Sequence, residues 1–313
     1  MPVDLSNKLV IGISSRALFD LEEANQVWET EGESAYIKFQ VERETEILKP
    51  GVGFALVQRI LGLNSKSKES GVRKAEVVIT SRNSPATSMR LFNSIVHHNL
   101  DIQRAILTGG TSVARYLKPF CVDLYLSAHE KDVEEAIQAG IAAAVIYQPN
   151  PQTTVLNAEN VSSETTPISM NNDQLRIAFD GDNVLFNNEA EDVFQNEGLA
   201  SFLAHEIKHN QRPLVDGPFA KLFRTLASMQ QDPGFDVSPI RTALVTARSL
   251  PTHLRVLNTF RAWGIHVDEA FFMGGVDKSG ILRAFEPHIF FDDQDVHCKS
   301  ASEVVSTARV PVR

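Results

Sequence analysis

The chain has 313 residues, of which 43% are hydrophobic and 22% are charged, and a formal net charge of −9. This length allows two domains that each bury a core, and the negative charge argues against nucleic acid or an anionic membrane as a partner. No apolar run approaches the roughly 20 residues that span a bilayer. The two cysteines, Cys121 and Cys298, fit a reducing cytoplasm. The N-terminal residues lack a signal-peptide pattern, so we expect a cytoplasmic protein.

The first half of the chain alternates strand and helix patterns. Strands are predicted at residues 8–13, 75–80, 105–107, 122–126 and 141–147, and helices around residues 22–42, 54–63, 86–98 and 130–139. Residues 149–173 are rich in Pro, Asn, Ser and Thr, which indicates a linker.

The same order returns after this linker, with strands predicted at residues 175–179, 242–245 and 288–293 and helices around residues 189–209 and 220–229. Thr80-Ser-Arg82 aligns with Thr246-Ala-Arg248, and Leu107-Thr-Gly-Gly110 aligns with Phe272-Met-Gly-Gly275. The matching order predicts an internal duplication, with parallel βαβ units in each half.

A pair of carboxylates follows a predicted strand of the second half in which four of the five residues are apolar. Leu175-Arg-Ile-Ala-Phe179 runs into Asp180-Gly-Asp182. Two carboxylates at the end of a buried strand repel each other and lose hydration, so a cation or a proton must offset their charge. Gly181 allows the backbone to approach a ligand closely. The simpler interpretation is an Asp-Gly turn.

Further polar groups follow at the ends of later predicted elements. Thr246 ends an apolar strand and Arg248 lies two residues beyond it, Lys278 lies on a loop, and Asp292-Asp293 end another strand. This order of motifs resembles that of the haloacid-dehalogenase-like (HAD-like) phosphohydrolases.

Longer segments resemble the cytosolic 5′-nucleotidase I family over nearly the whole chain. They are Ile177-Ala-Phe-Asp-Gly-Asp-Asn-Val-Leu-Phe186, Thr242-Ala-Leu-Val-Thr-Ala-Arg-Ser249, Phe290-Phe-Asp-Asp-Gln294, Ser14-Ser-Arg-Ala-Leu-Phe-Asp-Leu21 and Ser81-Arg-Asn-Ser-Pro85. The resemblance implies an α/β fold of two Rossmann-like, HAD-like halves. We expect a non-catalytic half at residues 1–148, a linker at 149–173, and a catalytic half at 174–313 with a helical cap at about 187–240.

The resemblance also implies magnesium-dependent hydrolysis of nucleoside 5′-monophosphates such as AMP. Asp180 would be the nucleophile that forms an aspartyl-phosphate. Asp182, with a pKa raised by repulsion from Asp180, would be the general acid and base. Thr246 and Lys278 would bind the phosphate.

Oxygen ligands would hold the Mg²⁺ ion, as a hard cation prefers. Asp180, the backbone carbonyl of Asp182 and the Asp292-Asp293 pair are the expected ligands. Arg248 has two open roles, a contact with the substrate phosphate or a structural ion pair.

Two further features of the second half allow alternatives. His205-Glu206-x-x-His209 matches a zinc-peptidase pattern, although a solvated helix face is the simpler interpretation because no further ligand motif follows. Four phenylalanines of the expected cap could stack on a nucleobase or pack in its core: Phe194, Phe202, Phe219 and Phe223.

The first half lacks the reactive groups of the second. Ser14, Val113 and Ser127-Ala128 stand where Asp180, Lys278 and Asp292-Asp293 stand, whereas Thr80 and Arg82 are retained. We expect this half either to stabilise the catalytic half by packing or to bind a nucleotide effector. Other open functions are hydrolysis of another small phosphomonoester and nucleotide-binding regulation, and homo-oligomerisation is also left open.

Overall fold

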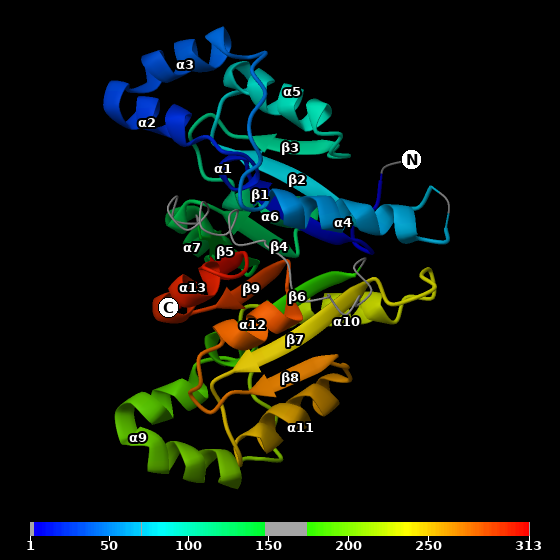
Figure 1. The fold of residues 1–313 in the computed structure, drawn as a ribbon, viewed down its shortest axis with the longest axis vertical. Coiled ribbons are helices and arrows are strands. Elements are labelled where there is room, and N and C mark those ends of the chain that lie inside the picture. Colours follow the sequence, from blue (N-terminus) through cyan, green and yellow to red (C-terminus); the bar gives the residue numbers. More distant parts are fainter. Residues whose placement is uncertain (1–2, 70, 148–173, 313) are drawn as a thin grey trace, which may run out of the picture. The chain divides into compact units, whose positions relative to one another are not determined.

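The computed structural model describes residues 3–69, 71–147 and 174–312, and the chain divides into two compact units, Met1–Ile146 and Tyr147–Arg313 (Figure 1). Each unit is a mixed α/β structure whose neighbouring strands run parallel. Among the described residues, no helix combines the length and apolar character that crossing a bilayer requires. Residues 149–173, the expected linker, lie outside the described part of the chain.

The strands of the first unit lie in the order β3-β2-β1-β4-β5. Its elements, in chain order, are β1 (Leu9–Ser14), α1 (Ser15–Leu18), α2 (Glu22–Glu31), α3 (Glu33–Glu42), α4 (Phe54–Lys66), β2 (Ala75–Ser81), η1 (Pro85–Thr87), α5 (Met89–His97), β3 (Arg104–Leu107), α6 (Ala114–Leu117), η2 (Lys118–Phe120), β4 (Leu124–Ser127), α7 (Glu130–Gln138) and β5 (Ala142–Ile146).

The strands of the second unit lie in the corresponding order, β8-β7-β6-β9-β10. Its elements are β6 (Leu175–Phe179), η3 (Gly181–Leu185), α9 (Glu189–Lys208), α10 (Ala220–Gln230), β7 (Ile240–Thr246), α11 (His253–Trp263), β8 (Glu269–Phe272), α12 (Ser279–Phe285), β9 (Ile289–Asp292), α13 (Asp295–Ser302) and β10 (Thr307–Arg309).

Each unit buries its own hydrophobic core against its strands. Val10, Val78 and Tyr125 belong to the core of the first unit, and Val245 and Phe290 to that of the second. Because the central strands are covered on both faces, they are nearly continuous apolar runs. Polar groups therefore collect where these strands end.

The register of the second sheet brings three strand ends together. Phe179, the last residue of β6, pairs with Leu244 of β7 and with Phe291 of β9. Since the three strands are parallel neighbours, the residues that follow them meet at one edge of the sheet. This is the position at which ligands bind in open α/β sheets.

The expected cap at about 187–240 contains two different kinds of helix. Phe223 of α10 is 1% exposed and packs edge-on against Phe179 of β6, with ring centroids 5.2 Å apart. Helix α10 thus belongs to the layer that covers the sheet, whereas α9 buries few side chains. Helices α11, α12 and α13 and strand β10 were not among the predicted elements.

A glycine bends the helical segment that follows the first strand of each unit. Gly32 separates α2 from α3 with φ 82° and ψ −174°, and Gly198 interrupts α9 with φ 82° and ψ 179°. Both angles lie in a region that glycine adopts without a steric penalty. The two units therefore share the same bend.

An aromatic pair flanks each bend at the same spacing along the chain. The rings of Trp28 and Tyr36 lie 5.4 Å apart at 89°, and those of Phe194 and Phe202 lie 6.1 Å apart at 81°. Both pairs have the edge-to-face arrangement that aromatic quadrupoles favour.

Matching hydrogen bonds fix the segment after each bend. Leu48 donates its backbone N–H to the Ser94 hydroxyl at 2.9 Å, and Leu214 donates to the Thr259 hydroxyl at the same distance. The units thus share contacts between segments far apart in sequence, in addition to their strand order.

A close backbone approach at Gly217 gives a test of this packing. A Cβ atom there would lie 2.4 Å from the Phe186 carbonyl oxygen and 2.6 Å from that of Val184. We expect Gly217→Ala to lower the melting temperature by roughly 3–10 °C, because overpacking costs about 1–3 kcal/mol. Gly280→Ala is the control, since a Cβ at this helical position has no neighbour within 4 Å; it should leave the melting temperature unchanged or higher. Equal shifts in calorimetry would contradict the packing described here.

Candidate active site

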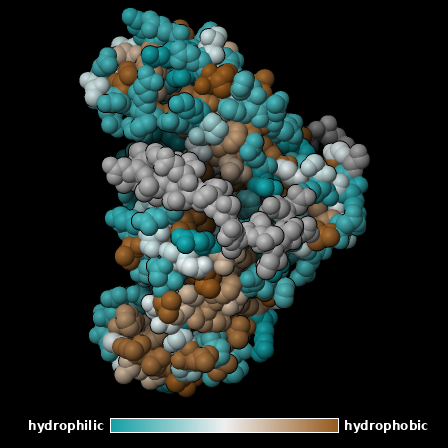
Figure 2. Space-filling view, in the orientation of Figure 1, coloured by the Kyte–Doolittle hydropathy of each residue, from teal (hydrophilic) through white to brown (hydrophobic). Residues whose placement is uncertain are grey.

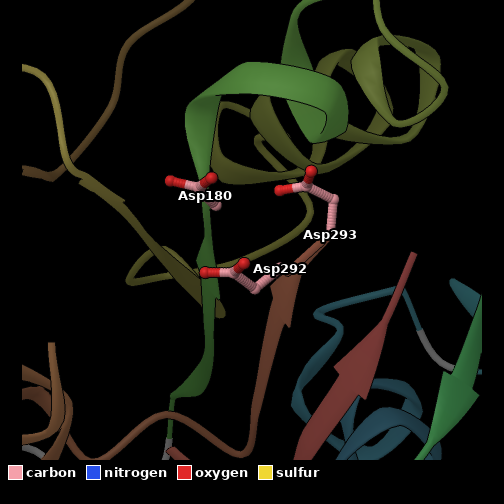
Figure 3. Close-up of side chains that lie close together, drawn as sticks. All are labelled: Asp180, Asp292 and Asp293. Carbon is pink, nitrogen blue, oxygen red and sulfur yellow. The ribbon is translucent and has the colours of Figure 1, made fainter. Parts of the chain in front are cut away.

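Three buried carboxylates meet at the edge where β6 and β9 end. Asp180 follows β6, Asp292 ends β9 and Asp293 follows it, with exposed fractions of 5%, 0% and 8%. One ligand oxygen from each lies within 4.8 Å of the other two, and Figure 3 shows the three side chains gathered around the end of β6. Like charges this close must be neutralised.

Lys278 supplies positive charge to this cluster. Its Nζ lies 2.6 Å from Asp292 Oδ2 and 2.9 Å from Asp180 Oδ1. The lysine is 4% exposed and lies immediately before α12. The structure therefore brings the Lys278 ammonium group to two of the three carboxylates from a separate loop.

The acids differ in their affinity for protons. Burial raises the pKa of Asp180 to about 7; the charge of Lys278 opposes this rise and the Asp292 carboxylate adds to it. Burial, together with the Asp292 charge, raises the pKa of Asp293 to about 6. Burial also acts against ionisation of Asp292, but the nearby His297 ring and the Lys278 ammonium lower its pKa below the usual value. A bound cation would displace protons from Asp180 and Asp293.

The donor set fits a divalent metal. All three side chains offer oxygen, which hard cations such as Mg²⁺ and Ca²⁺ prefer. Asp293 Oδ1 is buried and has no hydrogen-bond partner, although buried polar atoms are normally paired. Within the described ranges, this is the one cluster of three or more acidic, histidine or cysteine ligands close enough to share an ion.

Thr246 lies beside the loop that follows Asp180. It ends β7 and is 1% exposed. A Cβ atom on Gly181 would lie 3.2 Å from Thr246 Oγ1, so the glycine allows the loop to pass close to this hydroxyl. The Thr246 oxygen also accepts a hydrogen bond from the Arg248 backbone N–H at 3.3 Å.

Arg248 binds the second carboxylate of the Asp-Gly-Asp sequence. Its Nε donates to Asp182 Oδ2 at 2.8 Å and its Nη2 to Oδ1 at 2.7 Å, while Nη1 donates to Glu206. Burial lowers the pKa of Arg248, but the charges of these two acids hold it above its usual value. Of the two roles left open by the sequence, these contacts match the ion pair.

Glu206 joins this ion pair to a second buried arginine. Arg255, which is 0% exposed, donates from Nη1 to Glu206 Oε1 at 2.6 Å. Glu206 is 1% exposed, so its motif does not form the solvated helix face expected from the sequence. Two buried guanidinium groups need a buried anion nearby, and Glu206 supplies it.

The histidines of the same motif contact one another. The rings of His205 and His209 lie 4.3 Å apart, and His209 Nδ1 is 3.0 Å from the His205 carbonyl oxygen. Neither belongs to a three-ligand cluster in the described part of the chain. Glu206, the base of a zinc peptidase in this pattern, is instead held by arginines.

Sequence analysis missed several polar neighbours of the site. Asn183 Nδ2 donates to Asp293 Oδ2 at 3.0 Å, from a residue with φ 61°, and His297 Nδ1 lies 3.4 Å from Asp292 Oδ2. Arg255 was also missed. Asn183 lies only three residues after Asp180, and this proximity could have indicated that it belongs to the site. Nothing in the sequence around Arg255 indicates its contacts.

Two of the four phenylalanines considered for base stacking lie in the core. Phe219 and Phe223 are 0% and 1% exposed, and both pack on Phe179. Phe194 is 41% exposed and contacts Phe202. Packing thus accounts for Phe219 and Phe223, and Phe194 and Phe202 remain available to a ligand.

Comparison with known proteins agrees with the motifs. A family model described as 5′-nucleotidase matches residues 1–313. Human cytosolic 5′-nucleotidase 1B is 35% identical over 315 residues, which cover 98% of this chain and 49% of that protein. The chain therefore spans about half the length of this curated relative.

A solved structure of histidinol dehydrogenase from Elizabethkingia anophelis aligns over 96% of this chain and 79% of that one. Its identity of 8% and TM-score of 0.21 are too low to indicate a common fold. The family assignment depends on the sequence matches, which confirm the resemblance seen in the motifs. The chain belongs to the 5′-nucleotidase family.

Proposed function

We propose that this chain is a magnesium-dependent 5′-nucleotidase of the cytosol, which hydrolyses nucleoside 5′-monophosphates through an aspartyl-phosphate. The observation that carries the proposal is the placement of Asp180. It is buried at a strand end, 2.9 Å from Lys278 Nζ, within a carboxylate cluster that fits a divalent cation. Family membership and the human relative's name support the substrate class.

Asp180 would attack phosphorus through a carboxylate oxygen, and the bond from phosphorus to the 5′-oxygen would break. Asp182 would give its proton to the departing oxygen, which releases the nucleoside. Water would then attack the phosphorus of the aspartyl-phosphate, and Asp182 would take a proton from it. Phosphate leaves, and the Asp180 carboxylate is restored.

Lys278 and Thr246 would bind the transferring phosphoryl group. The ammonium group neutralises charge on its oxygens and the hydroxyl donates a hydrogen bond. Asp180, Asp292 and Asp293, with the backbone carbonyl of Asp182, would hold the Mg²⁺ ion. This ion would neutralise further charge on the phosphate.

Arg248 would orient Asp182. A carboxylate can accept a bidentate guanidinium and still use its remaining lone pairs, and Asp182 keeps a side-chain exposure of 20%. Arg248 itself is 4% exposed. We therefore assign Arg248 to positioning the acid and base, in place of the direct phosphate contact included among the expectations from sequence.

Helix α9 would form the cap. It carries exposed apolar side chains, including Phe194, Leu199 (60%) and Ile207 (51%), and Figure 2 shows hydrophobic surface gathered at the end of the second unit where α9 lies. Because Glu206 of α9 binds Arg248, closure of this helix would also fix the ion pair behind Asp182. Phe194 and Phe202 would contact the base.

The two units would derive from an internal duplication, and the second unit would be the catalytic one. The shared strand order, the paired glycine bends and the matched hydrogen bonds support this interpretation. In the first unit, Ser14 and Ser127 occupy the strand ends that Asp180 and Asp292 occupy in the second.

The first test replaces the nucleophile. Asp180→Asn should reduce phosphate release from AMP by roughly a thousandfold or more, with the melting temperature unchanged or raised because one buried negative charge is removed. Ser14→Ala, at the corresponding strand end of the first unit, is the matched control and should retain wild-type turnover. Substantial steady-state turnover by a folded Asp180→Asn variant would place the nucleophile elsewhere.

The second test removes the metal. EDTA should abolish phosphate release and Mg²⁺ should restore it, because the proposed ligands are all oxygen. Mg²⁺ should also raise the melting temperature of the wild type but not of Asp292→Asn, since a ligand stabilises the fold that binds it.

A variant with both His205 and His209 replaced by Ala is the control and should keep the Mg²⁺ response. Zinc-restored casein hydrolysis without phosphatase activity would favour the histidine pair and contradict the proposal.

A further inference from the structure

The first unit contains a cavity of about 460 Å³ at the carboxyl ends of β1, β2 and β4. Ser14, Ser81 and Ser127 end these strands and line it, and residues of α2 and α3 form another part of its wall. This volume lies in the range of small-molecule sites. The corresponding edge of the second unit holds the carboxylate cluster, but nothing in the proposed reaction uses this cavity.

The strand ends around the cavity carry hydroxyl groups in place of the reactive ions of the second unit. Ser14 lies at the end of β1 and Ser127 at the end of β4, and Val113, which precedes α6, also lines the cavity. No carboxylate among the described residues is therefore placed here as Asp180 is placed in the second unit. Hydroxyls can donate and accept hydrogen bonds, which suits an uncharged polar ligand.

The charges of the lining do not favour a phosphate. Apart from His129, the lining contains two arginines and three carboxylates: Arg16, Arg82, Glu29, Glu33 and Asp132. Arg16 is paired with Glu22 at 3.0 Å, and Arg82 is paired with the buried Asp132. A phosphate that took Arg82 would leave the Asp132 charge buried without its cation, which is costly.

The other retained residue of the motif is also engaged. Thr80 is 0% exposed, and its hydroxyl donates to the Tyr125 hydroxyl oxygen at 3.4 Å. Thr80 and Arg82 thus each have a partner within the unit, whereas Arg82 Nε is buried without one. Phosphate binding by this pair, one of the expectations from sequence, would require Thr80 and the Nη2 group of Arg82 to change partners.

One wall of the cavity is aromatic. The Trp28 ring is edge-to-face with Tyr36, and Trp28 is 45% exposed. Tyr36 is fixed, because its hydroxyl donates to Asn83 Oδ1 at 2.8 Å and accepts from Gln40 Nε2 at 3.0 Å. An exposed indole on a fixed support can stack on a flat heteroaromatic ring.

We propose that this cavity is a binding site for an uncharged nucleoside, with the base against Trp28 and the sugar hydroxyls toward the serine-lined strand ends. The ligand would be of the class that the proposed reaction releases. The choice of a nucleoside as the ligand rests on that proposed function. The observations on the cavity itself are independent of it: the aromatic wall, the hydroxyl-rich strand ends and the net negative lining. The first unit would thus bind the nucleoside product without hydrolysing a substrate.

Tryptophan fluorescence tests the assignment directly, because the chain has two tryptophans. In a Trp263→Phe variant, Trp28 is the only emitter. Adenosine should change its emission saturably, whereas inorganic phosphate and ADP should bind at least about tenfold more weakly, which corresponds to about 1.4 kcal/mol. An unchanged Trp28 emission with adenosine would overturn the proposal. Phosphate or ADP binding that Arg82→Ala removes, in the absence of adenosine binding, would also overturn it and assign the cavity to an anion.

A matched pair of aromatic variants locates the site by calorimetry. Trp28→Ala should weaken adenosine binding at this site by about tenfold or more, as expected for loss of a base–aromatic stack. Phe194→Ala, at the corresponding position of the second unit, should leave this site unchanged. Retained phosphate release by Trp28→Ala would show that the variant is folded. Loss of adenosine binding in Phe194→Ala but not in Trp28→Ala would contradict the placement.

The two proposals fail separately. Adenosine binding by the Asp180→Asn variant, measured at Trp28, does not require turnover. A chain that binds adenosine there but releases no phosphate would reject the nucleotidase proposal and keep the nucleoside site.

Discussion

The second unit depends on a local imbalance of charge. Parallel strands β6 and β9 end beside each other, so Asp180, Asp292 and Asp293 are buried together, and one ammonium group, that of Lys278, opposes them. In water such a cluster would disperse, but the apolar strands before each acid fix the backbone. Protons offset part of the charge, as the raised pKa values of Asp180 and Asp293 indicate. A divalent cation would offset the negative charge of the cluster more completely. The proposed reaction would use such a cation to neutralise charge on the phosphate.

A second network of buried charges includes Asp182 and two arginines. Arg248 and Arg255 are buried, and Glu206 binds both of them. Because Glu206 lies on α9 and Arg248 follows β7, the network ties the proposed cap to the loop that holds Asp182. Removing Glu206 would leave two buried cations without this anion, which costs about 3–5 kcal/mol for a broken buried pair. The cap and the acid–base group are therefore coupled by electrostatics as well as by chain connection.

Sequence patterns predicted the parts of this architecture that are local. The apolar run Leu175–Phe179 is β6 within the same bounds, and the motif order placed Lys278 with the carboxylates although it comes from a separate loop. Apolar periodicity and strand-end position carry the information on β6, whereas the expectation for Lys278 came from the resemblance of the motif order.

Contacts between buried charges on separate elements could not be predicted from the sequence. Glu206 lies in a helix whose spacing suggested a solvated face or a zinc motif, and nothing local indicates that Arg248 and Arg255 approach it. The same holds for Arg82. Its retention beside Thr80 suggested phosphate binding, but in the structure Arg82 pairs with Asp132. Residue type and spacing identify groups that can react, but partners are set by the tertiary fold.

The central claim is that Asp180 becomes phosphorylated during turnover, and trapping that species tests it most directly. The wild-type chain would be mixed with Mg²⁺ and AMP labelled in its phosphate, quenched in acid within one turnover, and digested. We expect acid-stable, hydroxylamine-labile label on the peptide that contains Asp180. Label on another peptide, or phosphate released within the first turnover without any labelled protein, would contradict the account.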